Sequence, residues 1–246
     1  MLYLLGTGLY YLNDVPLRAI SVISKCDHVF LERYTNTNDI GALNDIEKLV
    51  GKQVKVIGRD EAENDSIVSM ARDSNVALLV PGDPLFATTH VSLLAECKRR
   101  DIKYEVIHAG SILTAAAETG LSLYKFGAVC SIPIYTDAFK PESFFDTIEK
   151  NLKSGFHSLI LLEAKTENEF VDLQAAVKVL KEIEKKRGSK IINWANVVCM
   201  SLMGSTNQRM FFVSSGKNVD KPPLAIVIPS EVSPVEKENL ESFVEH

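Results

Sequence analysis

The apolar run at residues 76–80, Val-Ala-Leu-Leu-Val, stops abruptly at Pro81-Gly82-Asp83-Pro84. A short, continuous apolar run is typical of a strand that is buried on both faces of a parallel sheet. Two prolines so close together cannot continue a sheet, so the chain must turn here. Thr88 or Thr89 can then cap a helix over residues 91–99. A strand, a turn and a helix in this order predict an α/β fold.

Asp83 lies at the carboxyl end of this predicted strand, and open α/β sheets bind their ligands at that end. Pro81, Gly82 and Pro84 hold its backbone in a defined, irregular shape. Asp83 is therefore a candidate ligand-binding residue. An ordinary strand-to-helix turn with an exposed Asp explains the same residues equally well, so both interpretations stand at this point.

Strand-like and helix-like segments alternate through the first 110 residues. Further strands are expected at residues 2–5, 28–32, 53–57 and 104–107. Helices are expected at residues 15–24, 66–73 and 91–99, with a helix end at 46–50 and an Ala-rich helix that opens at Gly110-Ser111. This rhythm predicts a largely parallel sheet with helices on both faces.

The pattern changes after Leu121, where strands begin to follow one another without helices between them. Residues 130–135 alternate in polarity but contain Pro133, which predicts an edge strand. Further strands are expected at residues 157–162, 197–202, 210–213 and 225–228, and helices at residues 143–152 and 170–186. We therefore expect a mixed second sheet. We divide the chain into an N-terminal α/β domain at residues 1–112 and a C-terminal α/β domain at residues 113–246.

The composition narrows the class of protein. The chain has 246 residues, a formal net charge of -5 and 46% hydrophobic residues, as is ordinary for a globular protein. The negative charge argues against direct nucleic-acid binding, which needs a basic surface. No apolar run approaches the roughly 20 residues of a membrane span, and no signal-peptide pattern precedes residues 2–5. We expect a cytoplasmic protein without membrane contact.

Metal binding and nucleophilic catalysis find little support in the sequence. No pair of cysteines has Cys-x-x-Cys spacing, which argues against a zinc site or a disulfide framework. The cysteines are Cys26, Cys97, Cys130 and Cys199. His90 and His108 flank the candidate region but have no Cys or Asp at ligand spacing, so we predict structural roles for both and no metal. No nucleophile elbow is present either, and the catalytic residues stay unassigned.

Two glycine motifs allow more than one interpretation. Gly6-Thr7-Gly8 follows the first predicted strand, as in a dinucleotide-binding fingerprint, but position 11 is Tyr11 instead of glycine. In such a fingerprint an acidic residue contacts the ribose, and Glu32, at the end of the second predicted strand, is the candidate. Because the third glycine is absent, a tight turn explains Gly6 and Gly8 better than dinucleotide binding does. Gly110-Ser111 can offer backbone N–H groups to a ligand or can simply cap a helix.

Motifs along nearly the whole chain resemble the diphthine synthase family, and they occur in the family's order. In the first half they are Gly6-Thr7-Gly8-Leu9, Arg18 to Cys26-Asp27, Glu32-Arg33-Tyr34-Thr35, Pro81-Gly82-Asp83-Pro84, Ala87-Thr88-Thr89-His90 and Gly110-Ser111-Ile112. In the second half they are Leu123-Tyr124-Lys125-Phe126-Gly127, Tyr135-Thr136-Asp137, Pro141-Glu142-Ser143-Phe144-Phe145-Asp146 and His157-Ser158-Leu159. The stretch at residues 141–146 resembles the eukaryotic branch of the family.

The resemblance implies the tetrapyrrole-methylase fold, with two α/β domains, a cleft between them and usually a homodimer. It implies that S-adenosylmethionine binds in this cleft. The implied reaction is methylation of a modified histidine on translation elongation factor 2 during diphthamide biosynthesis. The archaeal type makes a trimethylated product, and the eukaryotic type adds a methyl ester.

The resemblance also implies which residues contact the methyl donor. They are Leu9, Asp83, Phe86, Ser111, Ile112, Leu162, Met203 and the position of Leu224. Leu224 departs from the family, which has His there. The chain also has Glu163-Ala164-Lys165 where the family often has Asp-Ile-Lys, and Met200-Ser201-Leu202-Met203-Gly204 where the family has Leu-Ala-Arg-x-Gly.

The chemistry implied by the resemblance is an in-line displacement at a methyl group that a sulfonium already activates. Positioning alone can supply up to roughly 7–11 kcal/mol of such a barrier. The acceptor amine must be neutral, and burial near a cationic sulfur lowers an amine pKa, so no protein base is assigned. Two alternatives stay open: a methyltransferase of the same fold that acts on a tetrapyrrole, and a non-catalytic module that binds the elongation factor and has lost donor binding.

Overall fold

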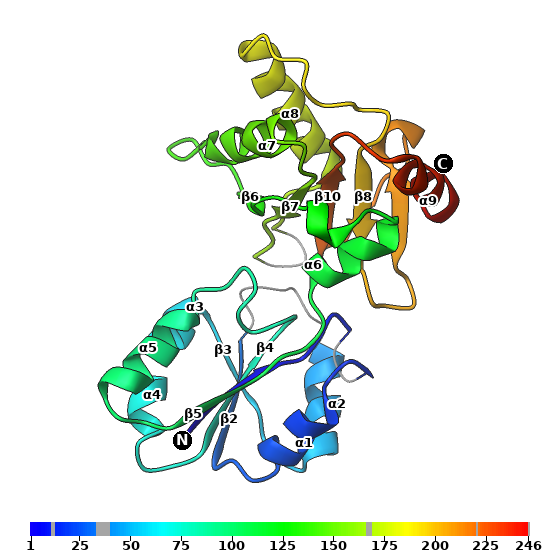
Figure 1. The fold of residues 1–246 in the computed structure, drawn as a ribbon. Helices are drawn as coiled ribbons and strands as arrows, with labels where there is room; N and C mark the ends of the chain where they lie inside the picture. The colour runs from blue at the N-terminus through cyan, green and yellow to red at the C-terminus, as the bar shows by residue number, and fades with distance from the viewer. Residues whose placement is uncertain (11–12, 33–39, 166–168, 220, 246) are drawn as a thin grey trace. The chain divides into compact units, whose positions relative to one another are not determined.

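The computed structural model of the chain describes residues 1–10, 13–32, 40–165, 169–219 and 221–245. The chain divides into two compact units, unit 1 at Met1–Ser111 and unit 2 at Ile112–His246. Each unit is built on one five-stranded sheet. Figure 1 shows the helices and strands of each unit. The predicted α/β class, with a parallel sheet first and a mixed sheet second, is confirmed.

The sheet of unit 1 has the strand order β3-β2-β4-β1-β5, and all of its pairs are parallel. Its strands are β1 (Leu2–Gly6), β2 (His28–Glu32), β3 (Lys55–Ile57), β4 (Val76–Val80) and β5 (Tyr104–Ile107). β4 lies between β2 and β1, and all five of its residues are buried. This central position explains the continuous apolar run that the sequence shows at residues 76–80.

Helices cover both faces of this sheet (Figure 1). α1 (Leu17–Ile23) and α2 (Ile40–Val50) pack on one face, whereas α3 (Arg59–Ala62), α4 (Ser66–Met70) and α5 (Val91–Arg99) pack on the other. Neighbouring strand residues point to opposite faces. Leu79 accordingly joins the apolar cluster of α1 and α2, while Leu78 joins that of α4 and α5.

The sheet of unit 2 has the order β6-β7-β10-β8-β9. Its strands are β6 (Cys130–Ile132), β7 (Ser158–Leu162), β8 (Val198–Ser201), β9 (Arg209–Phe212) and β10 (Leu224–Ile228). β6 runs parallel to β7, and the other three pairs are antiparallel. The predicted edge position of β6 is confirmed, and this strand ends just before Pro133.

Two amphipathic helices, α7 (Ser143–Lys153) and α8 (Leu173–Lys186), bury their apolar sides in the main core of unit 2. Phe145 and Leu180 from these helices meet Ile226 of β10 in this core. α6 (Ile112–Ala115) and α9 (Pro234–Phe243) are the remaining α-helices of the described part of this unit. No helix among the described residues is long and apolar enough to cross a membrane.

Two predictions about helix starts are wrong: the capping residue of α5 and the first residue of α8. α5 has His90 at its N-cap without a side-chain cap. Thr88 instead donates its hydroxyl proton to the carbonyl of Pro84, at 2.8 Å between oxygens, and Thr89 donates to Glu63. α8 begins three residues later than predicted because Asp172 caps it by accepting a hydrogen bond from the backbone N–H of Ala175.

A buried carboxylate fixes the start of α9. Glu236 accepts hydrogen bonds from the Lys125 ammonium at 2.7 Å and from the backbone N–H of Ser233 at 2.8 Å. Its other oxygen accepts from His157 Nε2 and from the Ser122 backbone N–H, both at 3.2 Å. Burial acts to raise the pKa of Glu236, but the Lys125 ammonium and these N–H donors outweigh it and hold the pKa well below its usual range.

We predict that Glu236→Gln lowers the free energy of unfolding by about 1.5–3 kcal/mol at neutral pH, because it removes hydrogen bonds to a charged group. The folded-state pKa lies below the unfolded value of about 4.3, so this stabilisation is present above that pH and is lost as the pH falls. Urea unfolding at about pH 7 and about pH 3 measures the effect. Glu238→Gln, at an exposed position of the same helix, is the control. If Glu236→Gln lowers the free energy of unfolding equally at both pH values, the ionised carboxylate of Glu236 is not the source of the stabilisation.

Candidate functional site

Three loops of unit 1 meet at the carboxyl edge of its sheet, and Gly6 lies at their meeting point. A Cβ atom on Gly6 would lie 2.6 Å from the carbonyl oxygen of Gly82, 2.8 Å from Cβ of Ala109 and 2.9 Å from Cδ of Pro84. These atoms belong to the loops that follow β4 and β5. Only glycine therefore allows the three loops to approach this closely.

Backbone hydrogen bonds join two of these loops directly. The N–H of Gly8 donates to the carbonyl of Gly82 at 3.2 Å, and the N–H of Gly82 donates to the carbonyl of Gly8 at 2.8 Å. Gly8 has a φ of +75°, which favours glycine. The tight turn predicted at Gly6-Thr7-Gly8 is not found there: Gly6 ends β1, the Thr7 N–H donates to the carbonyl of Val80, and Gly8 pairs with Gly82 of the loop after β4.

Asp83 lies just beyond β4, as predicted, and its carboxylate joins the loops after β4 and β5. Oδ1 accepts a hydrogen bond from the backbone N–H of Leu85 at 3.0 Å. Oδ2 accepts from Nδ1 of His108 at 2.8 Å and from the backbone N–H of Ala109 at 3.4 Å. The Asp83 side chain is 15% exposed and the His108 side chain 66%. The carboxylate is therefore held firmly beside an accessible imidazole.

The other site residues expected in unit 1 follow the ends of neighbouring strands. Leu9 follows β1, Phe86 follows β4 and Ser111 follows β5, and these three strands are adjacent in the sheet. Leu9 and Phe86 are half-buried, and Ser111 is buried. The Leu9 backbone N–H donates to the Asp14 carboxylate at 3.1 Å. Unit 1 thus gathers its predicted site residues at one edge of its sheet.

The site residues expected in unit 2 also share a sheet edge. Leu162 ends β7, Leu224 begins β10, and Met203 follows β8 by two residues. β10 runs antiparallel to both β7 and β8, with Ala225 opposite Leu161 and Leu224 opposite Ser201. All three side chains are buried, whereas Ile112, the first residue of α6, is half-buried.

Glu32 is buried, which argues against the ribose contact considered for it in the dinucleotide interpretation. Its carboxylate and the ring of His90 are both fully buried and are hydrogen-bonded to each other through Nε2 of His90. The structural role predicted for His90 fits this pair. Residues Tyr11, Arg33, Tyr34 and Thr35 lie outside the described residues.

His108 has a predicted structural role, but its pairing with Asp83, 25 positions earlier in the chain, was missed from the sequence. The available signal was its position at the end of a strand, the same signal that singled out Asp83. Among the described residues, no group of three or more His, Cys, Asp or Glu side chains could hold a metal ion.

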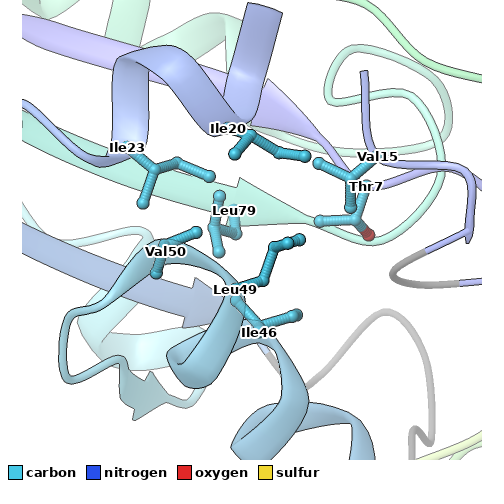
Figure 2. A pocket seen from close by; sticks show the side chains of 8 residues that line it. All are labelled: Thr7, Val15, Ile20, Ile23, Ile46, Leu49, Val50 and Leu79. Carbon is cyan, nitrogen blue, oxygen red and sulfur yellow. The ribbon is translucent and has the colours of Figure 1, made fainter. Parts of the chain in front are cut away.

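A small apolar cavity lies near this edge but does not suit a donor molecule (Figure 2). Its volume is about 10 Å³, which is at most the space of one water. The side chains that line it come from β4, α1, α2, the residue after β1 and the turn before α1: Thr7, Val15, Ile20, Ile23, Ile46, Leu49, Val50 and Leu79. We interpret this cavity as a packing gap between helices and sheet.

Comparison with known proteins gives a consistent result. Residues 1–216 match the family Tetrapyrrole (Corrin/Porphyrin) Methylases. The chain is 41% identical to diphthine synthase of Methanothermobacter thermautotrophicus over 76% of this chain and 72% of the relative. It is 36% identical to diphthine methyl ester synthase of Saccharomyces cerevisiae over 85% of this chain and 76% of the relative. A crystal structure of a diphthine synthase is similar, with a TM-score of 0.86 at 26% identity, covering 99% and 95% of the two chains.

We predict that Gly6→Ala destabilises the protein by about 1–3 kcal/mol, because the added methyl group forces three loops apart. Gly58→Ala is the matched control, since a Cβ there would have no heavy atom within 4 Å. Urea unfolding of both variants measures the difference. Equal stabilities for the two variants would show that the loops are not held at Gly6.

Proposed function

The chain belongs to the tetrapyrrole (corrin/porphyrin) methylase family, and from this membership we propose that it methylates translation elongation factor 2. The acceptor is the modified histidine of diphthamide biosynthesis, and the methyl donor is S-adenosylmethionine. The observation that carries the proposal is the 41% identity to a diphthine synthase over 76% of the chain. The relatives named diphthine methyl ester synthase support the same reaction class.

The donor chemistry fits the residues at the edge of unit 1. S-adenosylmethionine supplies a methyl group that a positively charged sulfur activates. Asp83 offers a fixed carboxylate for polar or cationic groups of such a donor. A Cβ on Gly82 or Gly110 would meet nothing within 4 Å, so both backbones border open space. We assign apolar contacts with the donor to Leu9 and Phe86.

The remaining assignments complete the donor site and come from the family resemblance. We propose that Ser111 and Ile112 present backbone or hydroxyl groups, and that Leu162, Met203 and Leu224 add apolar surface. We also propose a cytoplasmic homodimer whose protein substrate is elongation factor 2.

Transfer of labelled methyl groups to elongation factor 2 that carries the unmethylated intermediate tests the function. The proposal expects labelling that depends on this intermediate. Absence of donor binding in calorimetry, together with absence of labelling, would favour the non-catalytic module that has lost donor binding. A spectral titration that shows tight porphyrinoid binding, with the elongation factor unlabelled, would favour the tetrapyrrole methyltransferase.

We predict that Asp83→Ala weakens binding of S-adenosylmethionine by about 10- to 150-fold, the equivalent of about 1.5–3 kcal/mol for a hydrogen bond to a charged group. Calorimetry measures the dissociation constant, and circular dichroism checks that the variant is folded. Asp60→Ala, at the start of α3 on the same unit, is the control. Unchanged donor affinity in folded Asp83→Ala would remove this carboxylate from the donor site.

We predict that Leu224→His tightens donor binding by up to about tenfold, because the imidazole restores one neutral hydrogen bond worth about 0.5–1.5 kcal/mol. The variant should also unfold at lower urea concentration, since Leu224 is buried in an apolar cluster. Leu224→Met separates the loss of packing from the gained hydrogen bond. Weaker or unchanged donor binding by Leu224→His would mean that another residue makes this contact.

We predict that sedimentation at micromolar concentration gives a dimer. A species of monomer mass under these conditions would contradict the homodimer.

A further inference from the structure

His108 combines an accessible ring with a fixed carboxylate partner. Its Nδ1 lies 2.8 Å from Oδ2 of Asp83, and its side chain is 66% exposed. An ionised carboxylate can only accept hydrogen bonds, so Nδ1 must carry the proton of this bond. In the neutral ring, Nε2 then has a free lone pair. No bond to Nε2 occurs among the described residues.

The other described histidines lack this combination. His90 and His157 are fully buried, and both ring nitrogens of His157 are hydrogen-bonded to protein atoms. His28 is exposed, but it begins β2 at the amino edge of the sheet and has no carboxylate partner among the described residues. His108 alone of these four pairs an oriented ring with solvent access.

The carboxylate of this pair is itself held in place. The backbone N–H of Leu85 binds Oδ1 of Asp83, and that of Ala109 binds Oδ2. Gly6 brings the loops that carry Asp83 and Ala109 into contact. The ring of His108 is therefore oriented before any ligand arrives, as an efficient proton acceptor requires.

We propose that His108 is the proton acceptor for methylation of the amine, with Asp83 as its positioning residue; this inference rests on the proposed function. Transfer forms the N–CH₃ bond with the nitrogen lone pair, and the pair of the broken S–CH₃ bond goes to the sulfur, which becomes a neutral thioether. As this bond forms, the nitrogen becomes positively charged and, in every transfer that starts from a primary or secondary amine, passes its proton to Nε2 of His108.

The pair suits this task in both protonation states. The Asp83 carboxylate stabilises the imidazolium that forms, because it already accepts the Nδ1 proton. The exposure of the ring lets the proton leave to water, which returns His108 to its starting state. Among the described residues, Asp83 is the charged group that contacts His108.

The tautomer of His108 is the first test, and it is independent of turnover. Nitrogen NMR of ¹⁵N-histidine-labelled protein should show a protonated Nδ1 and an unprotonated Nε2 for the neutral ring. In Asp83→Ala this form should lose its dominance, while the His28 signals stay unchanged. A neutral His108 ring with its proton on Nε2 in the unmodified chain would overturn the proposal.

Turnover of variants is the second test. His108→Asn keeps an N–H that can donate to Asp83 but has no basic nitrogen, so methyl transfer should slow by about 10²- to 10⁴-fold. Its dissociation constant for S-adenosylmethionine should stay close to that of the unmodified chain. Added imidazole should restore transfer by His108→Ala, which a structural role would not allow. His28→Asn is the matched control and should transfer methyl groups at the unmodified rate.

The outcomes separate this inference from the proposed function. Full-rate transfer by His108→Asn, or a slow rate that imidazole does not restore in His108→Ala, overturns the role of His108 and leaves the methyltransferase in place. Absence of transfer by the unmodified chain overturns the proposed function, and the proton-acceptor role with it.

Discussion

The close approach of three loops at Gly6 is the constraint on which the candidate site of unit 1 depends. The reciprocal hydrogen bonds between Gly8 and Gly82 hold two of these loops together. Ala109 brings in the third, and its N–H then reaches the carboxylate of Asp83. Because Gly6 has no side chain, the loops that carry Asp83 and His108 can approach closely enough for the carboxylate and the imidazole to form a hydrogen bond.

The residues that we propose for donor binding are held by different physical means in the two units. In unit 1 the edge is polar, and hydrogen bonds to Asp83 define it. In unit 2 the corresponding residues, Leu162 and Leu224, belong to a buried apolar cluster. Hydrogen bonds orient groups, whereas apolar packing shapes a surface.

The sequence predicted those parts of the fold that local pattern determines. The bounds of β4 follow from an apolar run, and the structure has them as predicted. The predicted bounds of α5 are also found, although the expected cap at Thr88 or Thr89 is absent. The capping box of Ser233 and Glu236 at α9 was equally local, yet it was overlooked. The pair of Asp83 and His108 could not be predicted, because it depends on the strand order β4-β1-β5, which no local pattern contains. The burial of Glu32 against His90 depends in the same way on tertiary contacts.

The most direct test of this account is where a donor analogue binds. Backbone amide NMR of the chain titrated with S-adenosylhomocysteine reports this residue by residue. We expect the largest shifts at the amides of Gly8, Gly82 and Ala109, while the amides of His28 and Asn75 at the amino edge of the sheet stay unchanged. Saturable binding that leaves Gly8, Gly82 and Ala109 unshifted would contradict the account, because the meeting point of the three loops would then not be the donor site.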